Sequence, residues 1–193
     1  MDTKETIIQS TIDLINEKGE RMDTLTVREI AQRANVGLGL INYYFESKDK
    51  LIELCVERIV NGIVDAFHTI REQTENLSAF DKLACLGNMT FSFLFEHYAV
   101  SRTSILSDMR MPKDDDNTHR TYLAYLPLVS ACRPDWDEET LKRKTFYLIT
   151  VMQQSFLRHK VIGQLYGIDL TNAKERKRFH ETILHDILEN DES

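Results

Sequence analysis

Residues 25–51 decide the fold, and they read LTVREIAQRANVGLGLINYYFESKDKL. A capping box formed by Thr26 and Glu29 predicts the start of a short helix. The apolar face of that helix consists of Val27, Ile30, Ala31 and Ala34. Asn35 then tolerates the left-handed conformation that a tight turn requires, and a second short helix is expected over about 38–45. The stretch therefore predicts two short helices joined by a tight turn.

The spacing of three residues in this stretch is typical of a helix-turn-helix. Ala31 is small enough for the two helices to approach closely, Asn35 turns the chain, and Ile41 buries an apolar side chain against the first helix. A motif of this kind places its second helix in the major groove of DNA. The same spacing also fits an ordinary corner between two helices of an enzyme, so spacing alone leaves both interpretations open.

Helical patterns continue on both sides of this stretch. Upstream, Asp2 or Thr3 can cap a helix that ends at Gly19. Its apolar face consists of Ile7, Ile8, Ile12 and Ile15. Downstream, Ser47 caps a longer helix. Further helices are expected over about 77–99, 101–110, 118–131 and 136–163, and after a break over 163–171 a last one opens at an Asn172–Glu175 capping box. No stretch has the pattern of a strand, so we expect an all-α protein of about nine helices.

Composition bounds the class of protein but does not decide its function. The chain has 193 residues, 42% of them hydrophobic, which is enough for a packed core. Its formal net charge is −7, and residues 1–50 contain nine acidic and seven basic side chains. This balance favours a function other than DNA binding. Contacts to phosphate depend on where the charges lie, however, so the local pattern has to decide.

Cysteines and the N-terminus indicate a cytoplasmic protein. Cys55, Cys85 and Cys132 are odd in number and widely spaced, which predicts buried thiols in a reducing compartment. The first residues, MDTKE, lack the layout of a signal peptide. No apolar run approaches the ~20 residues of a membrane span, so we expect no membrane partner.

Three strings of the sequence strongly resemble the N-terminal domain of TetR-family transcriptional regulators. They are Leu25–Ala31, Val36–Phe45 and Ser47–Leu51, and the resemblance extends over about residues 5–55. The run Tyr-Tyr-Phe-x-Ser-Lys is the most specific part of it. The resemblance implies a homodimeric repressor that binds a double-stranded DNA operator and senses a small molecule.

This resemblance divides the chain into two functional parts. Residues 1–50 are expected to form a three-helix DNA-binding domain with the helix-turn-helix. Residues 51–193 are expected to form a helical domain for effector binding and dimerisation.

Five side chains are candidates for contacts with the DNA backbone. The helix that starts at Thr26 offers N–H groups to a phosphate, and Arg28 can reach a phosphate or a guanine edge. Lys48 follows the Ser47 cap, where its charge and the helix start together suit a phosphate. The family resemblance implies that tyrosines such as Tyr43 and Tyr44 donate to phosphates, and we favour Tyr43 and Lys48. Thr26 and Arg28 also fit an ordinary solvated helix.

The second helix is unusual where it would read bases. Gly37, Leu38, Gly39 and Leu40 offer no side-chain hydrogen bonds, whereas the family commonly has polar residues here. Leu38 and Leu40 could contact thymine methyl groups, and the glycines permit close approach of the backbone. Asn42 could pair with an adenine or a phosphate. Direct readout would then rest on Arg28 and Asn42, with DNA shape supplying the rest.

The C-terminal half predicts a dimer interface. The helix over about 136–163 carries apolar residues on two sides, one with Leu141, Leu148, Met152 and Phe156 and the other with Phe146, Ile149 and Leu157. A partner subunit is the natural cover for the second side, and with the helix over about 172–189 it would form a two-fold four-helix interface. The alternative is a central core helix in a monomer.

An effector pocket is expected among the helices over 77–131 and the long helix. Its candidate lining residues are aromatic side chains and methionines: Phe91, Phe95, Tyr98, Met109, Tyr122, Tyr125, Met152 and Phe156. Taken singly, each of them fits ordinary core packing better than a ligand contact. The six histidines lack the spacing of a metal site, so we expect neither a metal nor a cofactor.

Two other functions compete with a ligand-gated repressor. A helical enzyme or small-molecule-binding protein without DNA binding remains as an alternative, although the sequence has no phosphate loop, nucleophile motif or metal cluster. An architectural DNA binder would bind with little sequence preference, and the negative net charge argues against it. We therefore expect a regulator and no enzyme.

Overall fold

The computed structural model describes residues 2–59 and 76–189, and every regular element in these residues is a helix. The expected all-α class is thus confirmed. The chain divides into two compact units. The first consists of Met1–Ala66 with His97–Leu106, and the second of Phe67–Glu96 with Ser107–Ser193.

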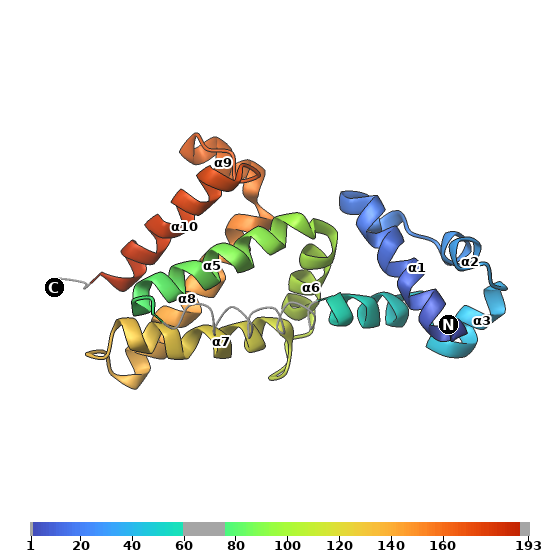
Figure 1. Cartoon of the computed structure of the whole chain (residues 1–193), viewed down its shortest axis with the longest axis horizontal. Helices are drawn as coiled ribbons and strands as arrows, with labels where there is room; N and C mark the ends of the chain where they lie inside the picture. Colours follow the sequence, from blue (N-terminus) through green and yellow to red (C-terminus); the bar gives the residue numbers. More distant parts are fainter. Residues whose placement is uncertain (1, 60–75, 190–193) are drawn as a thin grey trace. The chain divides into compact units, whose positions relative to one another are not determined.

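The first unit contains the short N-terminal helices (Figure 1). Its elements are α1 (Thr3–Lys18), the 3-10 helix η1 (Gly19–Thr24), α2 (Val27–Ala34), α3 (Leu38–Phe45) and helical residues 48–59. Asp2 caps α1 by accepting a hydrogen bond from the Lys4 N–H, and Gly19 ends the helix with a positive φ of 51°, both as expected. The helix η1 was not expected, because six mostly polar residues carry no helical period.

α2 and α3 form the expected helix-turn-helix. The Thr26 hydroxyl accepts from the Glu29 N–H at 3.2 Å and the Glu29 carboxylate accepts from the Thr26 N–H at 2.8 Å, which completes the capping box. Asn35 is left-handed, with φ 53° and ψ 48°, and it turns the chain from α2 into α3. The buried core behind the motif includes Ile7, Ile15, Leu25, Ile30, Ala31, Ile41, Phe45, Leu51, Cys55 and Val100. Ile41 therefore has the core position that the spacing predicts.

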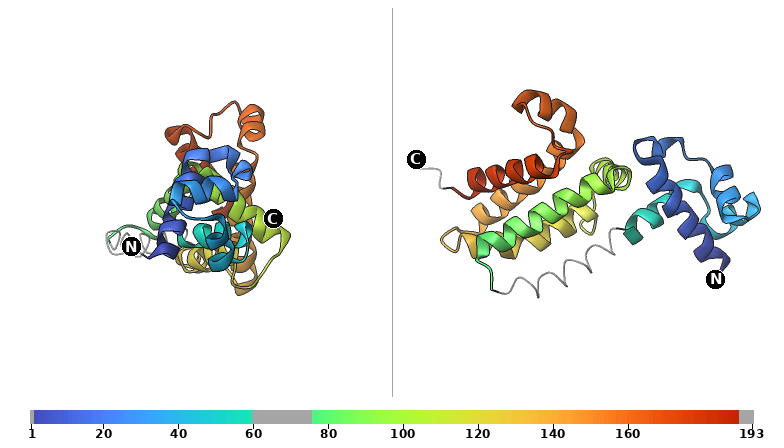
Figure 2. Two further views of the ribbon diagram at one scale, coloured as in Figure 1. Left: turned by 90° about the vertical axis from the view of Figure 1, so that its right-hand side faces the viewer. Right: turned by 45° about the horizontal axis from the view of Figure 1, so that its top comes forward.

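The second unit is a bundle of longer helices. Its elements are α5 (Ala79–Glu96), the end of α6 (Tyr98–Arg110), α7 (Asn117–Cys132), α8 (Glu138–Leu157), α9 (His159–Tyr166) and α10 (Ala173–Leu188). α5, α7, α8 and α10 lie side by side (Figures 1 and 2). Asp116 caps α7 and Asp137 caps α8, each by accepting from a backbone N–H three residues later.

The prediction of one continuous helix over about 136–163 is wrong, because two helices, α8 and α9, occupy this range. The chain breaks at Arg158, whose φ of −114° and ψ of 23° are not helical, and α9 begins at the next residue. The Phe156 carbonyl accepts from the Arg158 N–H and also lies 3.0 Å from the His159 ring nitrogen Nδ1. The Arg158 N–H also keeps its helical bond to the Gln154 carbonyl at 3.0 Å, so the backbone bends here without losing that hydrogen bond. No glycine or proline in the sequence indicates this break.

The turn between α9 and α10 begins later than expected. α9 continues through Gly163 to Tyr166, and Gly167 ends it in the left-handed region with φ 66°. Asn172 caps α10 as expected, because its side chain accepts from the Lys174 and Glu175 N–H groups. The reciprocal hydrogen bond of the predicted box, from the Asn172 N–H to the Glu175 carboxylate, is wrong, since this carboxylate accepts from the Asp169 N–H at 2.7 Å instead.

The described residues lack two further features. No helix among them combines the length and the apolar character that crossing a membrane requires. No three histidine, cysteine, aspartate or glutamate side chains within 2–59 and 76–189 gather as a metal site would need.

The Cys55 thiol is buried as expected, and burial raises its pKa to about 12. Cys85 and Cys132 are only half-buried, which corrects the expectation for these two.

Candidate nucleic-acid interface

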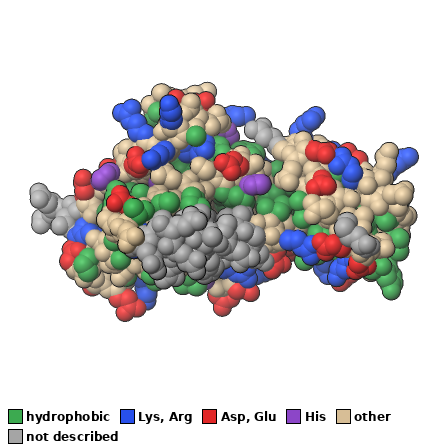
Figure 3. All heavy atoms as spheres, viewed as in Figure 1, with side chains coloured by type: hydrophobic (Ala, Val, Ile, Leu, Met, Phe, Trp, Pro, Cys, Tyr) green, Lys and Arg blue, Asp and Glu red, His purple; other side chains and the backbone are tan. Residues whose placement is uncertain are grey.

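α3 presents two different faces. Ile41 and Phe45 point into the core and are 0% and 5% exposed. On the outer side, Leu38 is 52% exposed and Tyr43 is 79% exposed. Leu40, Asn42, Gly37 and Gly39 are exposed as well, and apolar side chains reach the surface over this helix (Figure 3). This outer face therefore contributes nothing to the core and is free to contact a partner.

The start of α2 is already occupied by internal hydrogen bonds. The Thr26 hydroxyl donates to the Glu29 carboxylate at 2.8 Å, in addition to the two bonds of the capping box. Lys18 forms an ion pair with the same carboxylate at 2.8 Å. The hydrogen bonds from Lys18 and Thr26 lower the pKa of Glu29 to about 2. A phosphate at this helix end would thus bind the free N–H groups of Val27 and Arg28 rather than Thr26 itself.

Arg28 and Lys48 differ in how firmly the fold holds them. Arg28 is exposed and forms no ion pair with the described residues, so its guanidinium can reach out from the first turn of α2. Lys48 is half-buried, and its ammonium donates to the Leu25 carbonyl at 3.0 Å. That bond uses one of the three ammonium N–H groups and fixes the side chain beside the start of α2.

The two neighbouring tyrosines lie in different environments, as their positions on a helix require. Their rings meet edge to face, with centroids 5.1 Å apart. Tyr43 projects into solvent, whereas Tyr44 is half-buried and packs against the core beside Phe45. Tyr43 is therefore better placed than Tyr44 to donate to a phosphate.

Ion pairs explain how an acidic unit can still present positive charge. Several cations of the first unit face a carboxylate: Lys18 with Glu29, Arg33 with Glu17, Lys50 with Glu46 and Arg58 with Glu5. Each pair removes one acidic and one basic group from the local balance. Arg28 and Lys48 are outside these pairs, so their charges are not neutralised by the described carboxylates.

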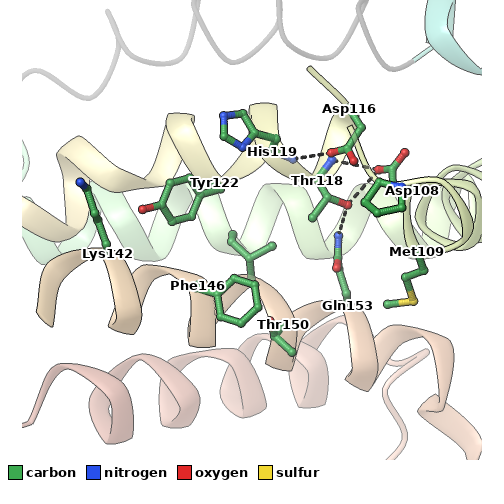
Figure 4. Close-up of a pocket in the computed structure, with 12 residues that line it drawn as sticks. Asp108, Met109, Asp116, Thr118, His119, Tyr122, Lys142, Phe146, Thr150 and Gln153 are labelled. Carbon is green, nitrogen blue, oxygen red and sulfur yellow. Dashed lines mark hydrogen bonds between the residues drawn. The ribbon is translucent and has the colours of Figure 1, made fainter. Parts of the chain in front are cut away.

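A hollow of about 540 Å³ opens within the second unit. It lies between the end of α6, the residues before α7, α7 itself and α8, and its side chains point toward a common space (Figure 4). A hollow of this size is in the range of small-molecule sites. The side chains that line it are Asp108, Met109, Pro112, Asp116, Thr118, His119, Tyr122, Lys142, Phe146, Ile149, Thr150 and Gln153.

The structure distributes the eight expected pocket residues over several places. Met109 and Tyr122 line the hollow. The buried core of the second unit holds Phe91, Tyr125, Met152 and Phe156. Phe95 packs edge to face against Phe156 and His159, and Tyr98 belongs to the first unit. The polar lining residues Asp108, Thr118 and Gln153 were not anticipated, because a search for aromatic side chains passes over them.

The fold and the exposed face of α3 define a helix-turn-helix protein. Residues 7–55 match the family model described as bacterial regulatory proteins, tetR family. The N-terminal segment of the chain, which contains the helix-turn-helix, is therefore similar to the N-terminal domain of this family.

Curated relatives resemble part of the chain. It is 31% identical over 102 residues to the probable HTH-type transcriptional regulator YttP of Bacillus subtilis (strain 168), covering 53% of this chain and 48% of that protein. It is 40% identical over 60 residues to the HTH-type transcriptional regulator BetI of Klebsiella pneumoniae (strain 342), covering 31% of this chain and 30% of that protein. The chain thus spans half or less of the length of these relatives. Both are named as transcriptional regulators.

Solved structures resemble the whole fold. A TetR-like transcriptional regulator from Rhodococcus sp. RHA1 has a TM-score of 0.66 at 14% identity, with 97% of each chain covered. A tetR-family transcriptional regulator from Streptomyces coelicolor has a TM-score of 0.64 at 17% identity, covering 97% of this chain and 80% of that one. At these identities the likeness concerns the fold alone, and it includes the helical C-terminal part.

Proposed function

We propose that the protein is a sequence-specific DNA-binding regulator of transcription that acts as a homodimeric repressor and is released from a palindromic operator by a small molecule. The observation that carries this proposal is the exposed outer face of α3, from Gly37 to Tyr43, set on a core that includes Ile41 and Phe45. A surface helix with several exposed apolar side chains is costly unless a partner covers it. In a helix-turn-helix, that partner is the major groove.

The proposed contacts with DNA are of two kinds: phosphate contacts that position the protein and base contacts that recognise the sequence. Arg28, Tyr43 and Lys48 bind phosphates, with the free N–H groups after Thr26 adding one more contact and Tyr44 supporting Tyr43. Leu38 and Leu40 contact thymine methyl groups, while Gly37 and Gly39 let the backbone approach the bases. Asn42 binds an adenine edge. Specificity in this arrangement depends more on methyl groups and DNA shape than on hydrogen bonds.

The dimer uses α8 and α10, the helices expected over about 136–163 and 172–189. Of the side expected to meet a partner, Ile149 is buried within the unit and lines the hollow together with Phe146, which corrects that part of the expectation. On the same helix, Tyr147 and Val151, one turn apart, are 46% and 37% exposed, which supports a second apolar face. A two-fold pairing would bring the two α3 helices to successive major grooves, about 34–36 Å apart.

The effector binds in the hollow between α7 and α8, where Met109 and Tyr122 contribute to the walls. A ligand that binds better to a dimer with altered spacing of the two α3 helices lowers DNA affinity. By linkage, DNA must lower the affinity for the effector by the same factor.

The proposed function is tested by titrating fluorescent duplexes from upstream of the protein's own gene against a scrambled duplex at two salt concentrations. We expect selective binding that weakens as salt rises, because phosphate contacts release counterions. Equal and weak affinity for all duplexes at both salt concentrations would contradict a sequence-specific regulator.

Uracil substitution tests the readout by leucine. Replacing a thymine that Leu38 or Leu40 contacts by uracil removes one methyl group and no hydrogen bond, so affinity should fall about three- to fivefold per site. Fluorescence anisotropy with an operator scanned base by base measures this. The Leu38→Ala variant should lose the sensitivity at its own position only. Equal affinity for thymine and uracil at every position would contradict methyl readout.

A further inference from the structure

A directed chain of hydrogen bonds closes one end of the hollow (Figure 4). The Gln153 amide nitrogen Nε2 donates to the Thr118 hydroxyl at 2.9 Å. That hydroxyl donates in turn to Oδ2 of Asp108 at 2.8 Å, and the Thr118 N–H donates to the same oxygen at 2.9 Å. All the donors of this chain therefore point toward Asp108.

This direction leaves acceptors at the hollow, and the second N–H of the Gln153 amide is the one donor of the chain that stays unused among the described residues. The second carboxylate oxygen of Asp108, Oδ1, accepts no hydrogen bond from the described residues, and the carbonyl oxygen of Gln153 is also unused. Asp108 is half-buried and forms no ion pair with the part of the chain that the structure describes. Its burial raises the pKa of the carboxyl above the ordinary value, although the Thr118 hydrogen bonds and the charge of Lys113 act in the opposite direction.

The other charges of the hollow do not cancel this negative end. Asp116 adds a second carboxylate, whose oxygens accept from the His119 and Lys113 N–H groups at 2.8 and 3.0 Å. Lys142 lies at the opposite end, where its ammonium forms an ion pair with Glu138 at 2.5 Å. His119 also lines the hollow, with its ring beside Tyr122.

Between the two ends the walls are apolar and in part open to solvent. Ile149 is buried in the floor, and Phe146 is 59% exposed at the rim. Met109 and Tyr122 complete the walls. The hollow thus combines an aromatic and aliphatic surface with one acceptor-rich, negatively charged end.

We infer that the hollow binds amphipathic organic cations, with a primary or secondary ammonium at the Asp108 carboxylate and an apolar body along Phe146 and Ile149. An ammonium brings a positive charge and N–H donors to this acceptor-rich end, and charge-assisted hydrogen bonds of this kind are the strong ones. The inference rests on the proposed function only in taking this hollow as the effector site.

Three dansyl amides that differ only in the end of a five-carbon chain test the ligand class. One ends in an ammonium, one in a methyl group and one in a carboxylate. Fluorescence titration of the full chain should give a dissociation constant for the ammonium probe at least about tenfold lower than for the other two. Equal constants for the ammonium and carboxylate probes, or no binding of any probe up to about 1 mM, would overturn the proposal.

Asp108→Asn is the decisive variant. Asparagine keeps an oxygen for Thr118 but presents an NH₂ donor without charge to the hollow, so the ammonium probe should lose its advantage about tenfold while the carboxylate probe gains. Asp115→Asn, an exposed change in the loop between α6 and α7, should leave all three constants unchanged. Phe146→Ala should weaken the three probes by a similar factor, because it removes shared apolar wall. Circular dichroism verifies the fold of each variant, and unchanged probe selectivity in folded Asp108→Asn protein would overturn the assignment.

Operator affinity measured with and without the ammonium probe separates this inference from the proposed function. Selective probe binding without any change in operator affinity keeps the ligand class and contradicts effector relief. Loss of operator affinity without charge selectivity among the probes keeps effector relief and contradicts the ligand class.

Discussion

Alanine in place of Ile41 is expected to destabilise the first unit by about 2–5 kcal/mol, because truncation of a buried isoleucine loses transfer free energy and leaves a cavity. Ile41 is 0% exposed and belongs to the core that α1, α2 and α3 share. A unit of 76 residues has only about 4–11 kcal/mol of stability to lose. The variant should therefore lose a large part of this stability, and DNA binding should fall as the helix-turn-helix unfolds.

Leu38→Ala is the matched control for this prediction. Leu38 lies on the same helix, one turn earlier, but it is 52% exposed. Its truncation should change the free energy of unfolding by no more than about 0.5 kcal/mol while it still weakens DNA binding.

Urea unfolding followed by circular dichroism and by Trp136 fluorescence measures both variants. The single tryptophan belongs to the second unit, so unfolding of the first unit alone changes the circular dichroism and leaves the fluorescence unchanged. Equal stability of the two variants would contradict the assignment of one face of α3 to the core and the other to a partner.

The helix-turn-helix could be predicted from the sequence because its determinants are local. Thr26 and Glu29 cap a helix through neighbouring atoms, and Asn35 is one of the few residues that adopt a left-handed backbone readily. Once the helix start at Thr26 and the turn at Asn35 are known, the helical period predicts that Ile41 is buried. The capping box also bears on the contacts with DNA. A Thr26 hydroxyl bonded to Glu29 has little capacity left for a phosphate.

The second unit was less predictable because its determinants are tertiary. The break at Arg158 lies where a histidine ring approaches the Phe156 carbonyl, and the apolar period runs through it without interruption. The hollow depends on which polar side chains α6, α7 and α8 bring together. Asp108, Thr118 and Gln153 are far apart in the sequence, and none is unusual alone. Aromatic content instead identified the core, where Phe91 and Tyr125 are buried.

Acid is expected to destabilise the second unit through His180. The ring is 0% exposed, neither nitrogen has a hydrogen-bond partner among the described residues, and it packs so closely on Gly87 that a Cβ there would lie 2.1 Å from it. Burial lowers the pKa of His180 from 6.5 to about 4. The folded state therefore holds this histidine neutral, whereas the unfolded chain takes up a proton below about pH 6.5.

The sign of the effect follows from this difference in protons. Stability from the neutral ring is fully present above pH 6.5 and is lost as the pH falls toward 4, because protons bind to the unfolded chain first. A shift of this size corresponds to about 3 kcal/mol lost over that range. His180→Gln keeps a planar polar group but does not titrate, so the variant should lose less stability than the wild type on acidification. His185→Gln, an exposed change on the same helix, should lose as much as the wild type.

Urea titrations at about pH 7.5 and 4.5, followed by Trp136 fluorescence, compare the three proteins. Carboxylates of the second unit also titrate in this range, so the difference between wild type and His180→Gln carries the result rather than either value alone. An equal loss of stability in these two proteins would mean that the folded state accommodates a charged ring at position 180. The seam between α5 and α10 would then have to open or admit water, because in the folded structure Gly87 and Phe91 surround the ring without an acceptor for its protons.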